Sequence, residues 1–139
     1  MVKILDMQFI RYANIFYNVT KIKTKHCFEY NNTIIFAVPR KLVIKAIGEN
    51  SRNLQKLSKI IGKKTKIVPI PKGKEDIKNF IYLITKPAKL KDIEIKNDEV
   101  IINANMQNKA SLIGKGKIRL NEMENILGQY FGIRKVRMR

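Results

Sequence analysis

Two short segments combine glycine with polar and basic residues at a spacing that suits a phosphate group. Glycine has no side chain, so a tight turn that contains it lets a sugar-phosphate backbone approach closely. A helix that begins at such a turn also directs N–H groups and the positive end of its dipole toward the phosphate. The two segments therefore predict a pair of phosphate-binding loops. Their candidate residues are Gly48, Glu49, Asn50, Ser51, Arg52 and Asn53 in the first loop and Gly114, Lys115, Gly116, Lys117 and Arg119 in the second.

A run of basic residues follows the first loop. They recur at steps of three and four, which places them on one face of a helix; this basic ridge consists of Arg52, Lys56, Lys59 and Lys63. Residues 40–74 hold 11 basic residues and a single acidic one, Glu49. A face that is merely solvated normally mixes both signs, so the imbalance favours phosphate contact. The end of the chain holds four more basic residues, Arg134, Lys135, Arg137 and Arg139. They form either a smaller phosphate-binding patch or a solvated strand edge that discourages pairing with another strand.

The whole chain is strongly positive. Its 139 residues include 29 Lys and Arg against 11 Asp and Glu, a net charge of +18, and 45% are hydrophobic, enough for a core. This surplus predicts a polyanionic partner, either nucleic acid or an anionic membrane. The sequence has no run of about 18 apolar residues, the length that a membrane-spanning helix needs. Asp6 lies where a signal peptide would have an apolar residue. We therefore expect a cytoplasmic protein that binds nucleic acid and not membrane.

Catalytic and metal chemistry are not indicated. Cys27 is the single cysteine and His26 the single histidine, too few for a disulfide or a four-ligand zinc site. Neighbours on a strand point to opposite faces, so these two do not form a nucleophile–base pair. Glu122 and Glu124 are two apart on a helix and do not share a face, and no Walker loop or serine-hydrolase motif occurs. We expect no enzyme activity, no metal and no cofactor.

The sequence repeats with a period of 66 residues. At this offset Asn31-Asn32 aligns with Asn97-Asp98, and Ile47-Gly48 aligns with Ile113-Gly114. The repeat predicts two copies of one small unit, joined by a linker rich in Pro and Gly around residues 69–73. Residues 1–74 hold 16 basic and 3 acidic residues, and residues 75–139 hold 13 and 8. We therefore expect the first copy to bind a polyanion more strongly.

Each copy is predicted to run helix-strand-strand-helix-helix-strand. In the first helix, apolar residues recur with helical period at Leu5, Phe9, Tyr12, Phe16 and Val19. The asparagine-containing pairs between strands suit tight turns. The predicted order in the first copy is a helix over 5–19, strands 25–30 and 33–38, helices 39–47 and 52–61, and strand 65–70. The predicted order in the second copy is a helix over 77–84, strands 89–96 and 99–105, a short helix ending at 113, helix 118–131 and strand 133–138. This order predicts an α+β fold, with helices packed on one face of a three-stranded sheet in each copy.

The chain resembles K-homology (KH) domains of type II, and in particular the tandem pairs of archaeal NusA-like transcription factors. The resemblance covers nearly the whole chain and lies in Arg11-Tyr12, Lys25-His26-Cys27, Ile34-Ile35-Phe36, Ala46-Ile47-Gly48, Gly62-Lys63-Lys64 and Tyr130-Phe131-Gly132-Ile133. It implies two tandem type-II KH domains, residues 1–71 and 72–139, whose loops bind the backbone of single-stranded RNA. It also implies a role in transcription elongation or termination. We expect a monomer.

Both loops depart from the family pattern Ile-Gly-x-x-Gly-x-Asn. Ser51 replaces the second glycine of the first loop, and Glu49 adds a negative charge beside it. In the second loop Lys117 replaces that glycine and Arg119 replaces the asparagine. Two other functions therefore stay open: a scaffold that docks on RNA polymerase, and a ribosome-associated protein that binds ribosomal RNA.

Overall fold

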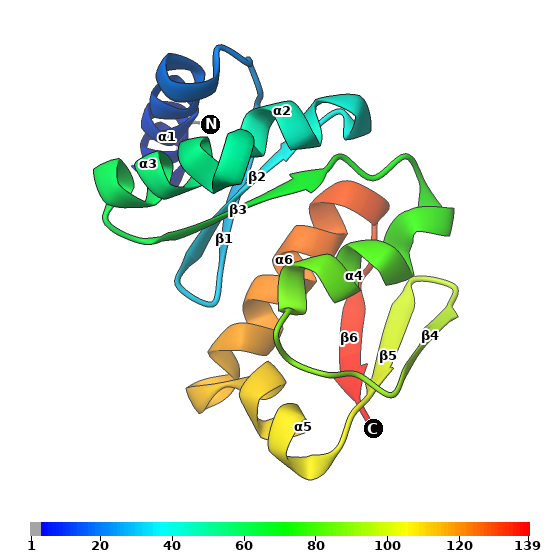
Figure 1. Ribbon diagram of the computed structural model, residues 1–139. Helices are drawn as coiled ribbons and strands as arrows, with labels where there is room; N and C mark the ends of the chain where they lie inside the picture. Colours follow the sequence, from blue (N-terminus) through cyan, green and yellow to red (C-terminus); the bar gives the residue numbers. More distant parts are fainter. Residues whose placement is uncertain (1–3) are drawn as a thin grey trace. The chain divides into compact units, whose positions relative to one another are not determined.

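The chain forms two compact α+β units, each with one three-stranded sheet. The computed structural model describes residues 4–139, and the side chains from residue 7 onward. Unit 1 comprises Met1–Ile70 and unit 2 comprises Pro71–Arg139; Figure 1 shows the elements of each. The division lies one residue before the boundary expected from the sequence.

Unit 1 combines helices with a mixed sheet. Its elements are α1 (Ile4–Thr20), β1 (His26–Tyr30), β2 (Thr33–Val38), α2 (Val43–Ile47), α3 (Arg52–Ile61) and β3 (Lys64–Pro69). In the sheet order β1-β2-β3, β1 and β2 are antiparallel and β2 and β3 are parallel. Asn31 and Asn32 join β1 to β2 with φ angles of 54° and 56°, as the tight hairpin turn predicted from the two asparagines requires.

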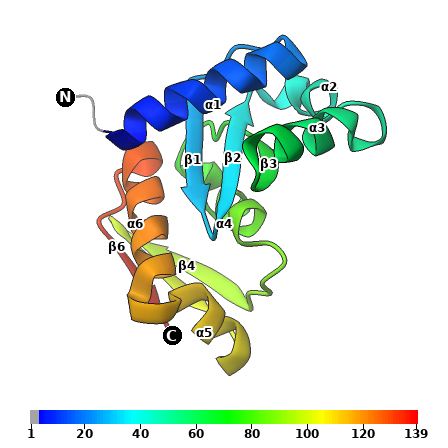
Figure 2. The ribbon, with the colours of Figure 1, turned by 90° about the vertical axis from the view of Figure 1, so that its left-hand side faces the viewer.

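The core of unit 1 lies between the sheet and its helices. The Phe16 ring of α1 stacks on the Phe36 ring of β2, with centroids 4.5 Å apart, and Leu57 of α3 is fully buried in the same cluster. The predicted apolar face of α1 is confirmed, because Tyr12 and Phe16 are buried and Phe9 packs against them. Leu5 lies outside the described side chains. Helices α1 and α3 therefore cover the same face of the sheet (Figure 2).

Unit 2 repeats this order with one longer helix. Its elements are α4 (Ile77–Thr85), β4 (Asp92–Lys96), β5 (Glu99–Asn103), α5 (Met106–Ile113), α6 (Ile118–Phe131) and β6 (Lys135–Met138). The sheet order β4-β5-β6 again pairs one antiparallel and one parallel neighbour. The 66-residue offset holds from the first strand through the start of the last helix. There it ends, since α6 has 14 residues and α3 has 10.

Three predicted strand ends in unit 2 are wrong, and a hydrogen bond explains each. The strand predicted from residue 89 begins at Asp92, because the Lys89 N–H donates to the Asn108 side chain at 3.2 Å. The strand predicted to reach 105 ends at 103, because Asn105 caps α5 by accepting from the Asn108 N–H at 2.9 Å. The last strand begins at 135 rather than 133, because the Ile133 N–H still bonds back to α6.

Leu57→Ala tests the core of unit 1. Leu57 is fully buried, so we expect its truncation to lower the free energy of unfolding by about 2–5 kcal/mol. Gln55→Ala, on the exposed side of the same helix, is the matched control and should change stability by less than about 0.5 kcal/mol. Urea unfolding followed by circular dichroism measures both. Equal effects of the two substitutions would contradict this packing.

Candidate nucleic-acid interface

Both units place a loop of the same backbone shape between their second and third helices. Gly48 follows α2 with φ 82° and ψ 164°, and Gly114 follows α5 with φ 76° and ψ 167°. Two left-handed residues then complete each loop before the next helix begins; they are Asn50 and Ser51 in unit 1 and Gly116 and Lys117 in unit 2. The N–H of the fourth loop residue donates to the carbonyl of the first at 3.1 Å in both. The sequence repeat is thus also a repeat of loop geometry.

The first glycine of each loop is required by its backbone and by its neighbour. Its φ and ψ fall in a region that is essentially restricted to glycine. A Cβ on Gly48 would lie 3.0 Å from the Asn53 side chain, and a Cβ on Gly114 would lie 2.9 Å from the Arg119 Cβ. The start of the third helix therefore packs directly on the end of the second, and only glycine leaves room for it.

The fourth residue of each loop stands where the pattern Ile-Gly-x-x-Gly-x-Asn has its second glycine. Ser51 has φ 59° and Lys117 has φ 62°, values that glycine adopts without strain and other residues adopt at a cost. Neither side chain caps the helix that it precedes. The N-cap side chains therefore leave the N-terminal N–H groups of α3 and α6 to other partners.

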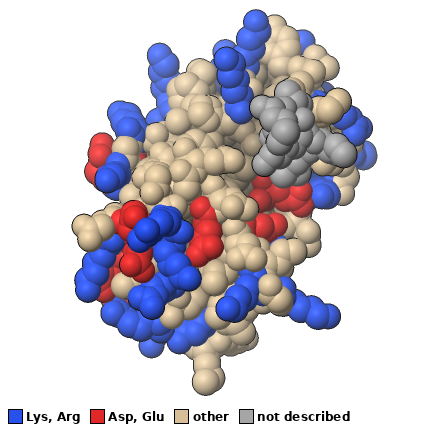
Figure 3. Space-filling view, turned by 180° about the vertical axis from the view of Figure 1, so that it is seen from behind, with Lys and Arg blue, Asp and Glu red and all other residues tan. Residues whose placement is uncertain are grey.

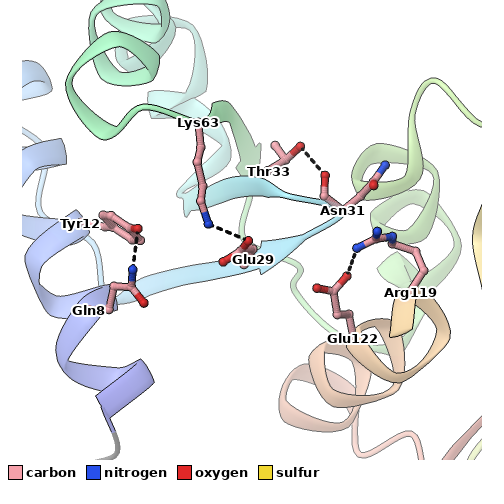
Figure 4. Close-up of polar contacts among 8 residues, drawn as sticks. All are labelled: Gln8, Tyr12, Glu29, Asn31, Thr33, Lys63, Arg119 and Glu122. Atoms are coloured by element: carbon pink, nitrogen blue, oxygen red, sulfur yellow. Dashed lines mark hydrogen bonds and ion pairs between the residues drawn. The ribbon is translucent and has the colours of Figure 1, made fainter. Parts of the chain in front are cut away.

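Three members of the predicted basic ridge extend from α3 without a carboxylate partner. Arg52, Lys56 and Lys59 are exposed, and among the described residues none of them takes part in an ion pair. Lys63 lies beyond the end of α3 at Ile61, so the prediction that all four residues share one helical face is wrong for it. Its Nζ lies 3.0 Å from Glu29 Oε2 on β1 (Figure 4). This hydrogen bond raises the pKa of Lys63, so the ammonium group stays protonated while its charge is shared with Glu29. Periodicity along α3 could not indicate Glu29, because the pairing depends on how the hairpin lies beside the start of β3.

The second loop is less basic than its sequence suggests. Lys115 and Lys117 are exposed, but the Arg119 guanidinium donates to Glu122 at 2.7 Å and its side chain is only 15% exposed (Figure 4). The spacing of three residues on one helix could have indicated this pair from the sequence. In the first loop the equivalent residue, Asn53, contacts Gly48 and donates to the Lys45 carbonyl at 3.5 Å. Arg119 and Asn53 thus hold the loops in shape.

Three of the four residues in the basic patch at the end of the chain pair with carboxylates, and Lys135 takes part in no ion pair among the described residues. Basic and acidic side chains alternate along the β4-β5-β6 sheet, in the ion pairs Arg134–Asp98, Arg137–Glu99, Arg139–Asp92 and Arg139–Glu94 at 3.2 to 3.9 Å. Figure 3 shows such an intermingled cluster of acidic and basic groups. The unpaired positive charge described above therefore lies in unit 1 and at the second loop.

The single cysteine is not suited to nucleophilic chemistry. Cys27 on β1 packs against the core of unit 1. Burial, with a smaller contribution from the charge of Glu29, raises the pKa of the Cys27 thiol to about 12. Among the described residues no group of His, Cys, Asp and Glu could hold a metal ion. Within the same part of the chain, no helix is both long enough and apolar enough to cross a membrane.

A feature outside the predicted site is a hollow in unit 1 between α1 and the start of β1. It has a volume of about 790 Å³, and its lining combines Tyr17 and basic residues with amide and apolar side chains. The alternation of Lys21, Lys23 and Lys25 after the first helix is the signal that could have indicated it from the sequence.

Comparisons with known proteins support the fold and go no further. No protein family and no curated protein matches the sequence. Solved structures do match, and one is the crystal structure of a protein called APE1850. That structure is similar to this chain with a TM-score of 0.63 and 24% identity, over 96% of this chain and 99% of the other. At this identity the likeness shows the two-unit α+β fold alone.

Gly48→Ala tests the helix contact at the first loop. We expect it to destabilise unit 1 more than Gly62→Ala does. Gly62 has φ 82° and ψ 17°, a left-handed conformation open to other residues at a cost, and a Cβ there meets nothing within 4 Å. Gly48 has φ 82° and ψ 164°, a conformation essentially restricted to glycine, and a Cβ there lies 3.0 Å from Asn53, so backbone and contact both add to its cost. Gly62→Ala should cost about 1 kcal/mol from the left-handed backbone alone. Thermal unfolding measures the difference, and equal costs would contradict the close contact at Gly48.

The raised pKa of Cys27 predicts slow alkylation. At pH 8 almost no thiolate forms in the folded protein, so iodoacetamide should react far more slowly than with the urea-unfolded chain. The contribution of this thiol to stability is complete below pH 9.0, its ordinary pKa, and is lost as the pH rises toward about 12. Mass spectrometry follows the reaction. Equal rates for folded and unfolded protein would refute the assigned pKa shift.

Proposed function

We propose that this protein binds single-stranded RNA through its two glycine loops and the basic face of α3. The observation that carries the proposal is the same glycine loop in both units, each followed by a helix whose N-cap side chain makes no cap. A phosphate beside such a loop could meet backbone N–H groups and the positive end of the helix dipole. The lysines and arginine of α3 extend the positive surface along one face.

The order of elements supports two tandem type-II KH domains. Each unit runs helix-strand-strand-helix-helix-strand, with the glycine loop between the second and third helices, as the sequence resemblance implies. The same resemblance favours a factor that acts in transcription elongation or termination. We further propose that it acts in the cytoplasm as a monomer, as expected from the sequence. The known KH mode of binding, in which the loop clamps backbone nucleotides, fits a single strand better than a duplex.

Unit 1 is the stronger RNA-binding unit in this proposal. It presents Arg52, Lys56 and Lys59 without acidic partners in the described chain, whereas Arg119 in unit 2 is held by Glu122. Glu49 is the unfavourable exception in the first loop. It is exposed, so solvent and salt weaken its repulsion of a phosphate.

The same loops give a second candidate, a scaffold that docks on RNA polymerase. The observation that favours it is the non-glycine residue in left-handed conformation at the fourth position of both loops. A loop kept only as a turn between helices could lose its second glycine without losing this function. Polymerase binding that survives nuclease treatment would favour the scaffold; loss of binding on nuclease treatment would favour RNA.

Lys56→Ala/Lys59→Ala tests the basic face of α3. We expect weaker binding to all single-stranded RNA sequences. The slope of log affinity against log salt should also become shallower by about 0.7 for each phosphate that the protein no longer neutralises. Arg137→Ala/Arg139→Ala is the matched control, since it removes the same charge from residues already paired with carboxylates. Fluorescence anisotropy at two salt concentrations measures both. An equal weakening in the control would show that net charge alone determines binding.

Ser51→Asp and Glu49→Lys test the first loop. Ser51→Asp adds a carboxylate at the N-terminus of α3, where the dipole stabilises it, so weaker RNA binding would not reflect unfolding. Glu49→Lys should strengthen binding by about 1 kcal/mol, since a cation replaces an anion beside the phosphate. Asn125→Asp, exposed on α6, controls for charge. Unchanged RNA affinity in folded Ser51→Asp would remove this loop from the site and favour the scaffold.

A further inference from the structure

The hollow of unit 1 lies apart from both glycine loops. Asn14, Tyr17 and Asn18 line it from the second half of α1, and Lys23, Lys25 and His26 line it from the segment that enters β1. Of the described residues that line it, none belongs to a glycine loop or to the basic ridge. Its volume of about 790 Å³ falls within the range of small-molecule sites.

Positive charge gathers over one aromatic ring at this hollow. The Lys21 and Lys23 ammonium groups lie 5.7 and 5.9 Å from the centroid of the Tyr17 ring. The described residues that line the hollow include no Asp or Glu, and no ion pair in the described chain uses Lys21, Lys23 or Lys25. Like charges close together repel, and among the described side chains no carboxylate pairs with these lysines to offset the repulsion. An anion in the hollow would do so.

The segment that carries these lysines is anchored to the sheet. The Thr24 hydroxyl donates to the Ala37 carbonyl at 2.6 Å and accepts from the His26 N–H at 3.1 Å. Lys23 and Lys25 therefore extend from a fixed backbone on either side of Thr24. A preorganised segment loses less conformational entropy when it binds a ligand.

The lining groups match the parts of a nucleotide. Tyr17 is 39% exposed and offers a ring on which a base can stack. The amides of Asn14 and Asn18 can donate to and accept from a base edge. A phosphate would give the lysines charge-assisted hydrogen bonds, which are stronger than their contact with the ring, and would leave the ring free for the base.

We propose that this hollow binds a nucleotide, with its base on Tyr17 and its phosphate on Lys23 and Lys25. Lys21 does not line the hollow but lies beside the Tyr17 ring and adds positive charge there. The nucleotide is either free or one unit of an RNA strand. In the strand form the inference rests on the proposed RNA binding, but the site itself uses none of the loop residues.

Adenosine 5′-monophosphate tests the site in the full chain. His26 is the single histidine, so its imidazole gives a unique NMR signal at the hollow. We expect this nucleotide to shift the His26 signal and to bind at least about tenfold more tightly than inorganic phosphate or adenosine alone, since base and phosphate contacts add. No shift at millimolar nucleotide, or equal binding of phosphate, would overturn the proposal.

Variants of the lining residues separate the two contacts. Tyr17→Leu should weaken nucleotide binding about tenfold and leave phosphate binding unchanged. Tyr17→Phe keeps an aromatic ring, so it should bind the nucleotide as tightly as the unchanged protein does. Lys23→Gln/Lys25→Gln should weaken both ligands. Lys78→Gln/Lys135→Gln removes the same charge from exposed positions in unit 2 and is the control. Equal nucleotide affinity in Tyr17→Leu and Tyr17→Phe would refute stacking on this ring.

An oligoadenylate of eight nucleotides distinguishes a free nucleotide from one unit of an RNA strand as the ligand of the hollow. If the hollow takes one unit of a strand, Tyr17→Leu weakens oligonucleotide binding as well; if it takes a free nucleotide, only the mononucleotide is affected. Ser51→Asp keeps the two proposals separable. If Ser51→Asp binds the oligonucleotide more weakly but binds the mononucleotide normally, the result supports both the loop function and the hollow. If Ser51→Asp binds the oligonucleotide normally, the result refutes the loop function and leaves the proposal for the hollow standing.

Discussion

The contact between Gly48 and Asn53, repeated between Gly114 and Arg119, sets how the last two helices of each unit meet. Because a Cβ at the glycine would lie 3.0 Å or less from its neighbour, the third helix can start directly against the second only if that residue is glycine. The same start fixes the rotation of α3, which turns Leu57 into the core and Lys56 toward solvent. The packing of Leu57 and the exposure of the basic face of α3 thus both depend on the close contact between Gly48 and the start of α3.

The positive charge that each unit presents to a partner depends more on ion pairing than on the number of Lys and Arg residues. Both units are rich in Lys and Arg, but unit 2 opposes its terminal arginines with carboxylates along the sheet, and Arg119 with Glu122. Exposed ion pairs of this kind contribute little stability, yet they lower the local potential that a polyanion would meet. In unit 1 the acidic residues whose side chains are described are Glu29, which pairs with Lys63, and Glu49. Positive potential therefore persists over α3 and around Tyr17.

Elements that depend on local periodicity were predictable from the sequence. The α3 helix begins at Arg52 and ends at Ile61 as predicted, because an apolar stripe and Gly62 define it. The start of β4 was not predictable, since it depends on the Asn108 side chain reaching Lys89 across the fold. The same holds for the site: the loops were found from their glycines, but the Lys63–Glu29 pair and the hollow beside Tyr17 arise from tertiary contacts.

The central claim is that the glycine loops contact RNA. The most direct measurement is a ¹H–¹⁵N NMR titration of the full chain with a single-stranded RNA of about twelve nucleotides, long enough to cover several phosphate contacts. The account predicts the largest amide shifts at residues 48–53 and along the exposed side of α3, with smaller shifts at residues 114–118. Shifts confined to the ion-paired residues of the β4-β5-β6 sheet, or no shifts at either loop, would contradict it.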